Sequence, residues 1–110
     1  MSTAAAQAVL VAHYQIRAGA DLEELRRISE RMWALAHEEP GFGFRAGRYL
    51  TAGDGSQVAI YEFDDLAGLE RFRLHPEHLA VQHRGPEFFE WMRNDVCTVV
   101  RQDTLGQVPP

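Results

Sequence analysis

The chain has 110 residues, which suits one domain, and hydrophobic residues make up 45% of it, enough for a core. The net charge of −5 argues against a nucleic-acid-binding protein, whose contact face is usually basic. The single cysteine, Cys97, excludes an internal disulfide and a cysteine-cluster metal site, and no run approaches the roughly 20 apolar residues of a membrane-spanning helix. Because the N-terminus also lacks the basic residues of a signal peptide, we expect a cytoplasmic protein with no nucleic-acid or membrane partner.

The first third of the chain predicts a strand followed by a helix. Side chains alternate between two faces over residues 8–16, as in a strand. Asp21 can cap a helix, and Glu24, three residues later, can reach back to the free backbone N–H groups. Apolar residues then recur at helical spacing until Pro40-Gly41, which is expected to end the helix.

The middle of the chain predicts a hairpin and a second helical region. Residues 42–51 and 57–63 are expected to be strands, joined by a turn rich in Gly and Asp. A helix is expected over residues 65–74. Because proline disfavours helix at the preceding residue and suits a first helical position, a new short helical turn is expected from Pro76.

The last part predicts one more helical turn and one more strand. Pro86 is expected to start the turn, and the apolar run at 95–101 is expected to be the final strand. Residues 1–7 and 103–110 are expected to be tails. A single domain over residues 8–102 follows from these boundaries.

This order of elements, β-α-β-β-α-β, predicts an α+β fold of the ferredoxin-like type. In that fold the helices cover only one face of the sheet. The expected strands are nevertheless apolar on both faces: Val58 and Ile60 point away from Ala59 and Tyr61. Because an uncovered apolar face needs a partner, we predict a homodimer that packs sheet to sheet.

Several motifs resemble two related families. The stretch FDDLAGLERFRLHPEHLAVQ, residues 63–82, resembles the stress-responsive α/β-barrel (Dabb) family, with a strand-ending Phe, an acidic pair and HPxH before an apolar run. EPGF at 39–42, DG at 54–55 and YE at 61–62 are similar to the antibiotic-biosynthesis monooxygenase family. Together these resemblances span about residues 8–102. Both families are dimeric α+β barrels, so the resemblance implies that fold and a dimer here.

The Dabb resemblance implies a role for the second histidine of the HPxH motif. In cyclases of that family this histidine is a base that acts on a polyketide, and the matching residue here is His78. Phe72 stands three residues before His75, where those cyclases carry a Tyr. Ile60 and Asp64 stand where the monooxygenases often carry an Asn and a Trp.

The chemistry of histidine agrees with such a role. Imidazole titrates near neutral pH and can take a proton from a phenol or an activated C–H group. Two orientations stay open for His78: inward against an apolar wall, as a general base, or outward on the helix surface. His75 either orients a substrate or caps the turn after Pro76. Two histidines without a third ligand hold a metal ion poorly, so no metal site is expected.

Other candidate residues lie on the expected strands and helices. The hydroxyl groups of Tyr14 and Tyr61 either find partners in the core or orient a substrate carbonyl, replacing the phenol absent at Phe72. Glu62 is either exposed or a buried carboxylate paired with Arg45. An expected helix-borne aromatic set forms either core or the wall of a site for a flat ligand. Its members are Trp33, Phe72, Phe88, Phe89, Trp91 and Met92.

Three functions are compatible with these observations. The first is a base-assisted aldol or Claisen-type cyclisation of a small apolar, aromatic or polyketide-like molecule, with His78 as the base. The second is a cofactor-independent monooxygenase, in which the deprotonated phenolic or anthrone-like substrate reacts with oxygen. The third is a non-catalytic small-molecule-binding or stress-response protein. Since the sequence has no phosphate-binding loop or dinucleotide fingerprint, no nucleotide cofactor is expected.

Overall fold

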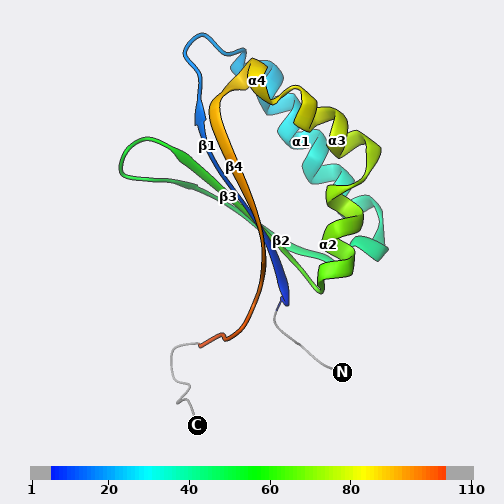
Figure 1. Ribbon diagram of the computed structural model, residues 1–110. Helices are drawn as coiled ribbons and strands as arrows, with labels where there is room; N and C mark the ends of the chain where they lie inside the picture. Colours follow the sequence, from blue (N-terminus) through cyan, green and yellow to red (C-terminus); the bar gives the residue numbers. More distant parts are fainter. Residues whose placement is uncertain (1–5, 104–110) are drawn as a thin grey trace.

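The structure, a computed structural model that describes residues 6–103, is an antiparallel sheet with helices on one face (Figure 1). The four strands lie in the order β2-β3-β1-β4. They are β1 (Ala8–Ile16), β2 (Phe44–Thr51), β3 (Gln57–Phe63) and β4 (Phe89–Thr98). The helical elements are α1 (Leu22–Glu38), the 3-10 turn η1 (Pro40–Phe42), α2 (Leu66–Arg73), α3 (Pro76–His83) and α4 (Gly85–Phe88). The predicted α+β ferredoxin-like fold is confirmed.

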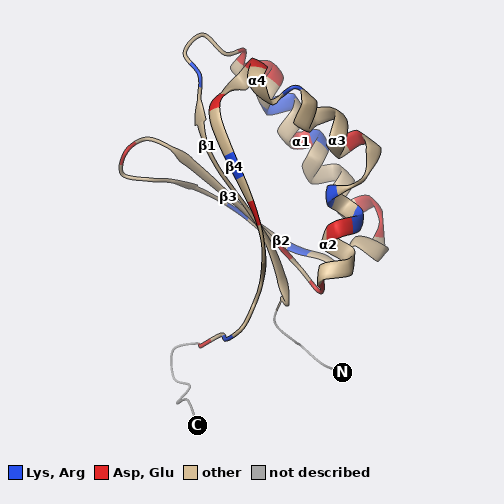
Figure 2. Ribbon diagram, in the orientation of Figure 1, with Lys and Arg blue, Asp and Glu red and all other residues tan. Residues whose placement is uncertain are grey.

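The central strand β1 has the boundaries that the alternation predicts, and it pairs with both β3 and β4. Ala12 lies opposite Ala59 of β3 on one side and Asn94 of β4 on the other. No charged residue occurs in β1. Most of the charged residues instead lie on the helices and the loops, as Figure 2 shows. An uncharged strand in the middle of the sheet is free to pack on both of its faces.

Helix α1 begins at the predicted cap. The Asp21 carboxylate accepts a hydrogen bond from the backbone N–H of Glu24 at 3.0 Å, which satisfies one of the donors left free at the helix start. Its buried stripe of Met32, Leu35 and Ala36 faces the sheet and joins the core. The helix ends at Glu38, shortly before Pro40, as expected.

Two boundaries in the middle of the chain differ from prediction. The strand expected from residue 42 begins at Phe44, because Pro40–Phe42 forms the 3-10 turn η1. Gly43 closes that turn with φ at 66°, a left-handed conformation that glycine adopts without steric cost. The turn expected after Pro76 is longer than predicted and forms the eight-residue helix α3.

The last strand begins earlier than predicted. The helical turn containing Pro86 ends at Phe88, and Phe89 already pairs with Ile16 of β1. The placement of Phe89, Trp91 and Met92 on a helix is therefore wrong, because these residues lie in β4. Their sequence spacing suits a helix, but the free edge of β1 offers a full row of backbone partners, and this pairing outweighs local preference.

The sheet has two different faces. The inner face, toward the helices, continues into the core, which contains Ala8, Leu10, Met32, Leu35, Ala36, Phe42, Phe63, Leu69 and Phe72. Within residues 6–103, no helix covers the outer face (Figure 1). Its apolar and aromatic members, by register, are Val9, Val11, His13, Ala46, Leu50, Val58, Ile60, Trp91 and Cys97.

A chain of hydrogen bonds fastens the β2–β3 hairpin to β1. The Ser56 hydroxyl donates its proton to the Asp54 carboxylate at 2.6 Å, and Nε2 of His13 lies 2.8 Å from the same hydroxyl oxygen. Since Ser56 has no second proton to give, His13 is the donor in the latter bond. The Ser56 side chain is fully buried, and the His13 ring packs edge-on against Trp91 on the outer face.

Candidate active site

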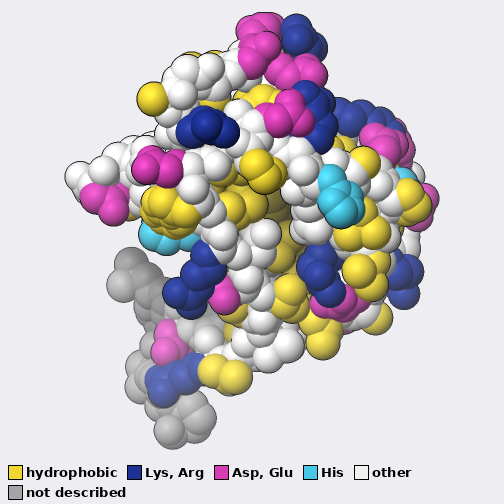
Figure 3. All heavy atoms as spheres, turned by 45° about the horizontal axis from the view of Figure 1, so that its top comes forward, with side chains coloured by type: hydrophobic (Ala, Val, Ile, Leu, Met, Phe, Trp, Pro, Cys, Tyr) yellow, Lys and Arg dark blue, Asp and Glu magenta, His cyan; other side chains and the backbone are white. Residues whose placement is uncertain are grey.

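A cavity of about 470 Å³ lies between the inner face of the sheet and the helices. This volume is in the range of small-molecule sites in proteins. Figure 3 shows a hollow in which hydrophobic side chains gather between the strands and the helices. The sheet side of the cavity consists of Leu10, Ala12, Tyr14, Tyr49, Ala59, Tyr61, Phe89, Met92, Asn94 and Val96.

His78 lies on the helical wall of this cavity. Its Nδ1 is 3.1 Å from the backbone carbonyl of Arg73, at the end of α2. A carbonyl oxygen can only accept, so Nδ1 carries the proton and donates it. Nε2, the other ring nitrogen, makes no hydrogen bond with any residue in 6–103 and keeps its lone pair in the neutral ring. Of the two predicted orientations, the ring has the inward one, toward the cavity.

The environment of His78 favours the neutral imidazole. Burial lowers its pKa below the ordinary 6.5, and the electrostatic effects of Arg73 and His75 act in the same direction. The hydrogen bond to the Arg73 carbonyl opposes this shift because it favours the protonated ring. The Phe72 ring lies 4.8 Å from the imidazole, centroid to centroid, and contributes to the apolar surroundings. An uncharged His78 at neutral pH has the protonation state that a general base needs.

His75, the first histidine of the motif, caps helix α3. Its Nδ1 accepts a hydrogen bond from the backbone N–H of Glu77 at 3.1 Å, and Pro76 occupies the first helical position. The ring does not line the cavity. Of its two predicted roles, the geometry is that of the cap.

Tyr14 and Tyr61 both line the cavity, together with a third tyrosine, Tyr49, that was not among the predicted site residues. The hydroxyl groups of Tyr61 and Tyr49 are hydrogen-bonded at 3.0 Å. Burial raises the pKa of Tyr61 above its ordinary 10.0, with a further contribution from the Tyr49 hydrogen bond. Burial also raises the pKa of Tyr14. Both phenols therefore keep their protons at neutral pH and are available as hydrogen-bond donors.

The other predicted substrate-binding residues are divided between the two faces of the sheet. Phe72 and Phe88 line the cavity. Trp33 does not; it packs on Phe44 and fills the space above Gly47, where a side chain would collide with the indole. Trp91 and Glu62 lie on the outer face by register. The predicted Glu62–Arg45 pair is wrong, because Arg45 pairs with Asp64 at 2.9 Å.

Five polar residues on the cavity wall were not predicted as site residues. They are Ser29 of α1, Tyr49 of β2, Arg73 at the end of α2, Gln82 of α3 and Asn94 of β4. Arg73 also forms an ion pair with Glu70 at 2.8 Å. Tyr49 shares the parity of Gly47 and Thr51 in a strand with little apolar alternation, and Asn94 precedes the expected start of the last strand. Tyr49 and Asn94 reach the cavity through the register between neighbouring strands, which the sequence of one strand alone does not determine.

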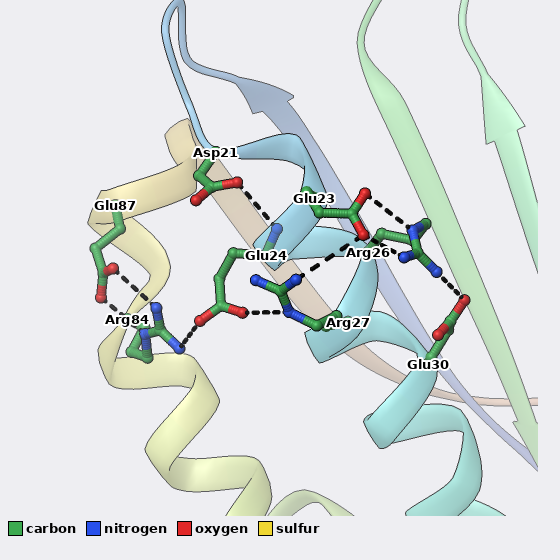
Figure 4. A network of polar contacts seen from close by, with 8 residues as sticks. All are labelled: Asp21, Glu23, Glu24, Arg26, Arg27, Glu30, Arg84 and Glu87. Atoms are coloured by element: carbon green, nitrogen blue, oxygen red, sulfur yellow. Dashed lines mark hydrogen bonds and ion pairs between the residues drawn. The ribbon is translucent and has the colours of Figure 1, made fainter.

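Ion pairs join the two helical segments at one end of the cavity (Figure 4). Arg84, between α3 and α4, contacts Glu24 of α1 at 3.2 Å and Glu87 of α4 at 2.9 Å. Arg27 shares the Glu24 carboxylate at 3.1 Å. Exposed pairs of this kind contribute little to stability individually. As a network they hold α1 beside the α3–α4 corner, whose residues line the cavity.

Within 6–103, no cluster of three or more His, Cys, Asp or Glu side chains is placed to hold a metal ion. No helix in this part of the chain is both long and apolar enough to cross a membrane.

Comparison with known proteins shows the fold. No model of a protein family matches the sequence, and no curated protein matches it. Among solved structures, the chain is similar to SnoaB, a cofactor-independent oxygenase from Streptomyces nogalater, with a TM-score of 0.71 at 19% identity, covering 94% of this chain and 100% of SnoaB. It is also similar to Rv0793 from Mycobacterium tuberculosis, with a TM-score of 0.71 at 18% identity over 88% of this chain and 98% of that one. A dimeric ferredoxin-like protein of unknown function from Thermobifida fusca has a TM-score of 0.64 at 12% identity over 90% and 96% of the two chains.

Proposed function

We propose that this protein removes a proton from a small, largely apolar, aromatic or polyketide-like molecule, with His78 as the general base. One observation carries the proposal: a buried imidazole on the cavity wall gives its Nδ1 proton to the Arg73 carbonyl and keeps the Nε2 lone pair for a ligand. The HPEH motif and the fold support placing the chain with the Dabb and antibiotic-biosynthesis monooxygenase families.

The reaction we favour is an aldol or Claisen-type ring closure. Nε2 of His78 takes a proton from a carbon between two carbonyl groups, and the resulting enolate carbon attacks another carbonyl of the same molecule. In the aldol case the new alkoxide recovers the proton from the imidazolium; in the Claisen case the thiolate leaving group does. The Tyr61 hydroxyl donates a hydrogen bond to a substrate carbonyl and stabilises the charge that develops there. The Phe72 ring is close to both side chains, so Tyr61 on the sheet side lies near His78 on the helical wall.

A second candidate, cofactor-independent oxygenation, is favoured by the similarity to SnoaB. Its first step is the same proton removal by His78. The phenolate or carbanion then gives electrons directly to molecular oxygen, and the ring CH₂ group of an anthrone becomes a carbonyl while water is released. The two candidates therefore share a base and differ in whether oxygen is consumed.

Two assays separate these reactions. The first incubates the protein with a linear polyketide thioester under argon and follows ring formation by mass spectrometry; we expect cyclised product. The second incubates it with 1,8-dihydroxyanthrone in air and under argon and follows quinone absorbance. Enzyme-dependent quinone formation that requires air, without ring closure in the first assay, would reject cyclisation in favour of oxygenation. If neither assay gives product while the protein still binds the ligand, both reactions are rejected and a binding protein is favoured.

We also propose that the chain forms a homodimer through the outer face of the sheet. This face carries Val11 and Ile60 opposite each other at its centre and no covering helix. An uncovered apolar face of this kind marks an interaction surface. Its occupant is a second copy of the chain, since an isologous contact matches such a patch with itself.

A further inference from the structure

The register of the sheet places one row of small and polar residues across the floor of the cavity. Tyr49 of β2 lies opposite Ala59 of β3, Ala59 opposite Ala12 of β1, and Ala12 opposite Asn94 of β4. All four residues line the cavity. We call them the alanine row. Its two central positions carry only methyl groups, while its two ends carry hydrogen-bonding groups.

The rows on either side of the alanine row carry larger side chains. Two residues along each strand, roughly 6.7 Å away, one neighbouring row presents Tyr61 and Leu10 and the other presents Tyr14 and Met92. The alanine row is therefore a trough that runs across the strands between two ridges. Adjacent strands lie about 4.8 Å apart, so the trough extends about 14 Å from the Cα atom of Tyr49 to that of Asn94.

We infer that Ala12 and Ala59 determine ligand specificity, and that Tyr49 and Asn94 position the ligand at its two ends. This rests on the proposed function in assuming that the cavity holds a small molecule and that Tyr61 donates a hydrogen bond to it. A trough with a methyl floor, bounded by ridges, accepts a flat and elongated ring system and leaves no depth for a bulky one. Donors and acceptors at both ends select a ligand that carries oxygen substituents at opposite ends of its long axis.

The two ends have different hydrogen-bonding chemistry. Tyr49 already shares a hydrogen bond with Tyr61, so its hydroxyl is held in place and presents one further donor or acceptor position. Because Tyr61 gives its proton to the substrate in the proposed mechanism, Tyr49 is the donor in their shared bond, and the Tyr49 end therefore accepts from a ligand hydroxyl. Asn94 is exposed on the edge strand, and its side chain has no hydrogen-bond partner in residues 6–103. Its side-chain amide therefore offers both a donor and an acceptor. The Asn94 end can bind either a hydroxyl or a carbonyl group.

Binding of two probes tests the role of the alanine row. Wild type, Ala59→Leu and Ala12→Leu are titrated by calorimetry under argon with 2,6-dihydroxyanthraquinone, a flat three-ring probe with a hydroxyl at each end of its long axis, and with resorcinol, a one-ring probe. We expect each Leu variant to lose about tenfold or more of its affinity for the three-ring probe while resorcinol binding changes by less than about threefold. The matched control is Ala46→Leu, an alanine of β2 that lies on the opposite face.

A second set of variants tests the ends without filling the floor. Asn94→Leu and Tyr49→Phe each remove one hydrogen-bonding group and are expected to weaken binding of 2,6-dihydroxyanthraquinone by about threefold to tenfold. Arg93→Leu, next to Asn94 but on the other face, is the control and is expected to bind like wild type. These exposed or edge positions also keep the inference testable if the Leu variants fail to fold by circular dichroism.

The outcomes separate this inference from the proposed function. Any of three results would overturn the role of the alanine row: unchanged affinity in the Leu variants, an equal loss of affinity for both probes, or an equal loss of affinity in the control variants. Because the readout is binding under argon, it does not depend on turnover. If the Leu variants lose only the three-ring probe and the wild type shows no catalysis, the alanine row is supported and His78 as the base is not. If the wild type is catalytic but the Leu variants bind both probes equally well, the base is supported and the alanine row is not.

Discussion

His78 holds one ring proton against the Arg73 carbonyl and leaves its other nitrogen free, so a change that keeps the first contact and removes the base is informative. His78→Gln keeps an amide N–H for the carbonyl but has no titratable nitrogen. We expect turnover to fall by about 100-fold or more, the usual contribution of a positioned general base. His83→Gln, an exposed histidine of the same helix, serves as the control. Initial rates within a few fold of wild type in the His78 variant would remove the base from the mechanism.

The pH dependence of activity follows from the lowered pKa of His78. The base works in its neutral form, so kcat/KM is expected to fall on the acid side with a midpoint below 6.5. The folded protein binds fewer protons here than the unfolded chain, so stability is also lost as pH falls from about 6.5 toward the folded pKa. An acid limb centred above 6.5 in a pH–rate profile would contradict the buried, neutral imidazole.

At this scale the sequence singled out His78 as the candidate base but not the residues around it. His78 was recognisable from the HPxH motif, and Tyr14 and Tyr61 from their strand parity. Asn94 and Tyr49 were not recognisable, because each reaches the cavity only through pairing with a strand distant in sequence. Trp91 was assigned to the wrong side, since its strand was taken for a helix.

At the scale of elements, helix α2 carries Phe72 and ends just before the turn that leads to His78. The Asp65 carboxylate caps this helix by accepting the Gly68 N–H at 2.8 Å. We expect Asp65→Ala to lower the free energy of unfolding by about 1 kcal/mol, measured by denaturant titration. Asp64→Ala is the matched control, because it removes a neighbouring carboxylate with an exposed Arg45 partner and is expected to cost less. Equal effects of the two changes would argue against the cap.

Helix α2 also approaches η1 closely at one glycine. A Cβ atom on Gly68 would lie 2.1 Å from the Phe42 carbonyl oxygen, so the backbones must separate to admit it. We expect Gly68→Ala to destabilise the protein by about 1–3 kcal/mol in the same assay. Gly53→Ala, where nothing lies within 4 Å of the added atom, is expected to be tolerated. Wild-type stability of the Gly68 variant would show that the two elements are not in contact.

The elements with clear local signals were predicted to within a residue or two. Alternation defined β1 and β3, and the Asp21 cap and Pro40 bounded α1. The errors arose where tertiary pairing opposed local preference. Phe89 and its neighbours follow a proline at a spacing that suits a helix. They nevertheless form strand β4, because their backbone pairs with the long edge of β1.

For the whole molecule, the two faces of the sheet lead to a prediction about assembly. Ile60 lies opposite Val11 near the centre of the outer face. We expect the wild type to sediment as a dimer and Ile60→Arg to sediment as a monomer, because a buried guanidinium without a partner is costly to desolvate. Leu22→Arg, at an exposed apolar residue of α1, is expected to leave the dimer intact. A monomeric wild type at micromolar concentration would contradict this use of the outer face.

The alternation along β1 and β3 has an evolutionary consequence. Ala12 and Ala59 face the cavity, whereas their chain neighbours Val11 and Ile60 face the other way. A mutation at one position can therefore alter what the protein recognises, and a mutation at the next can alter what it assembles with. Adjacent codons in these strands are free to drift under separate selective pressures, which makes the scaffold well suited to acquiring new ligands by a few substitutions.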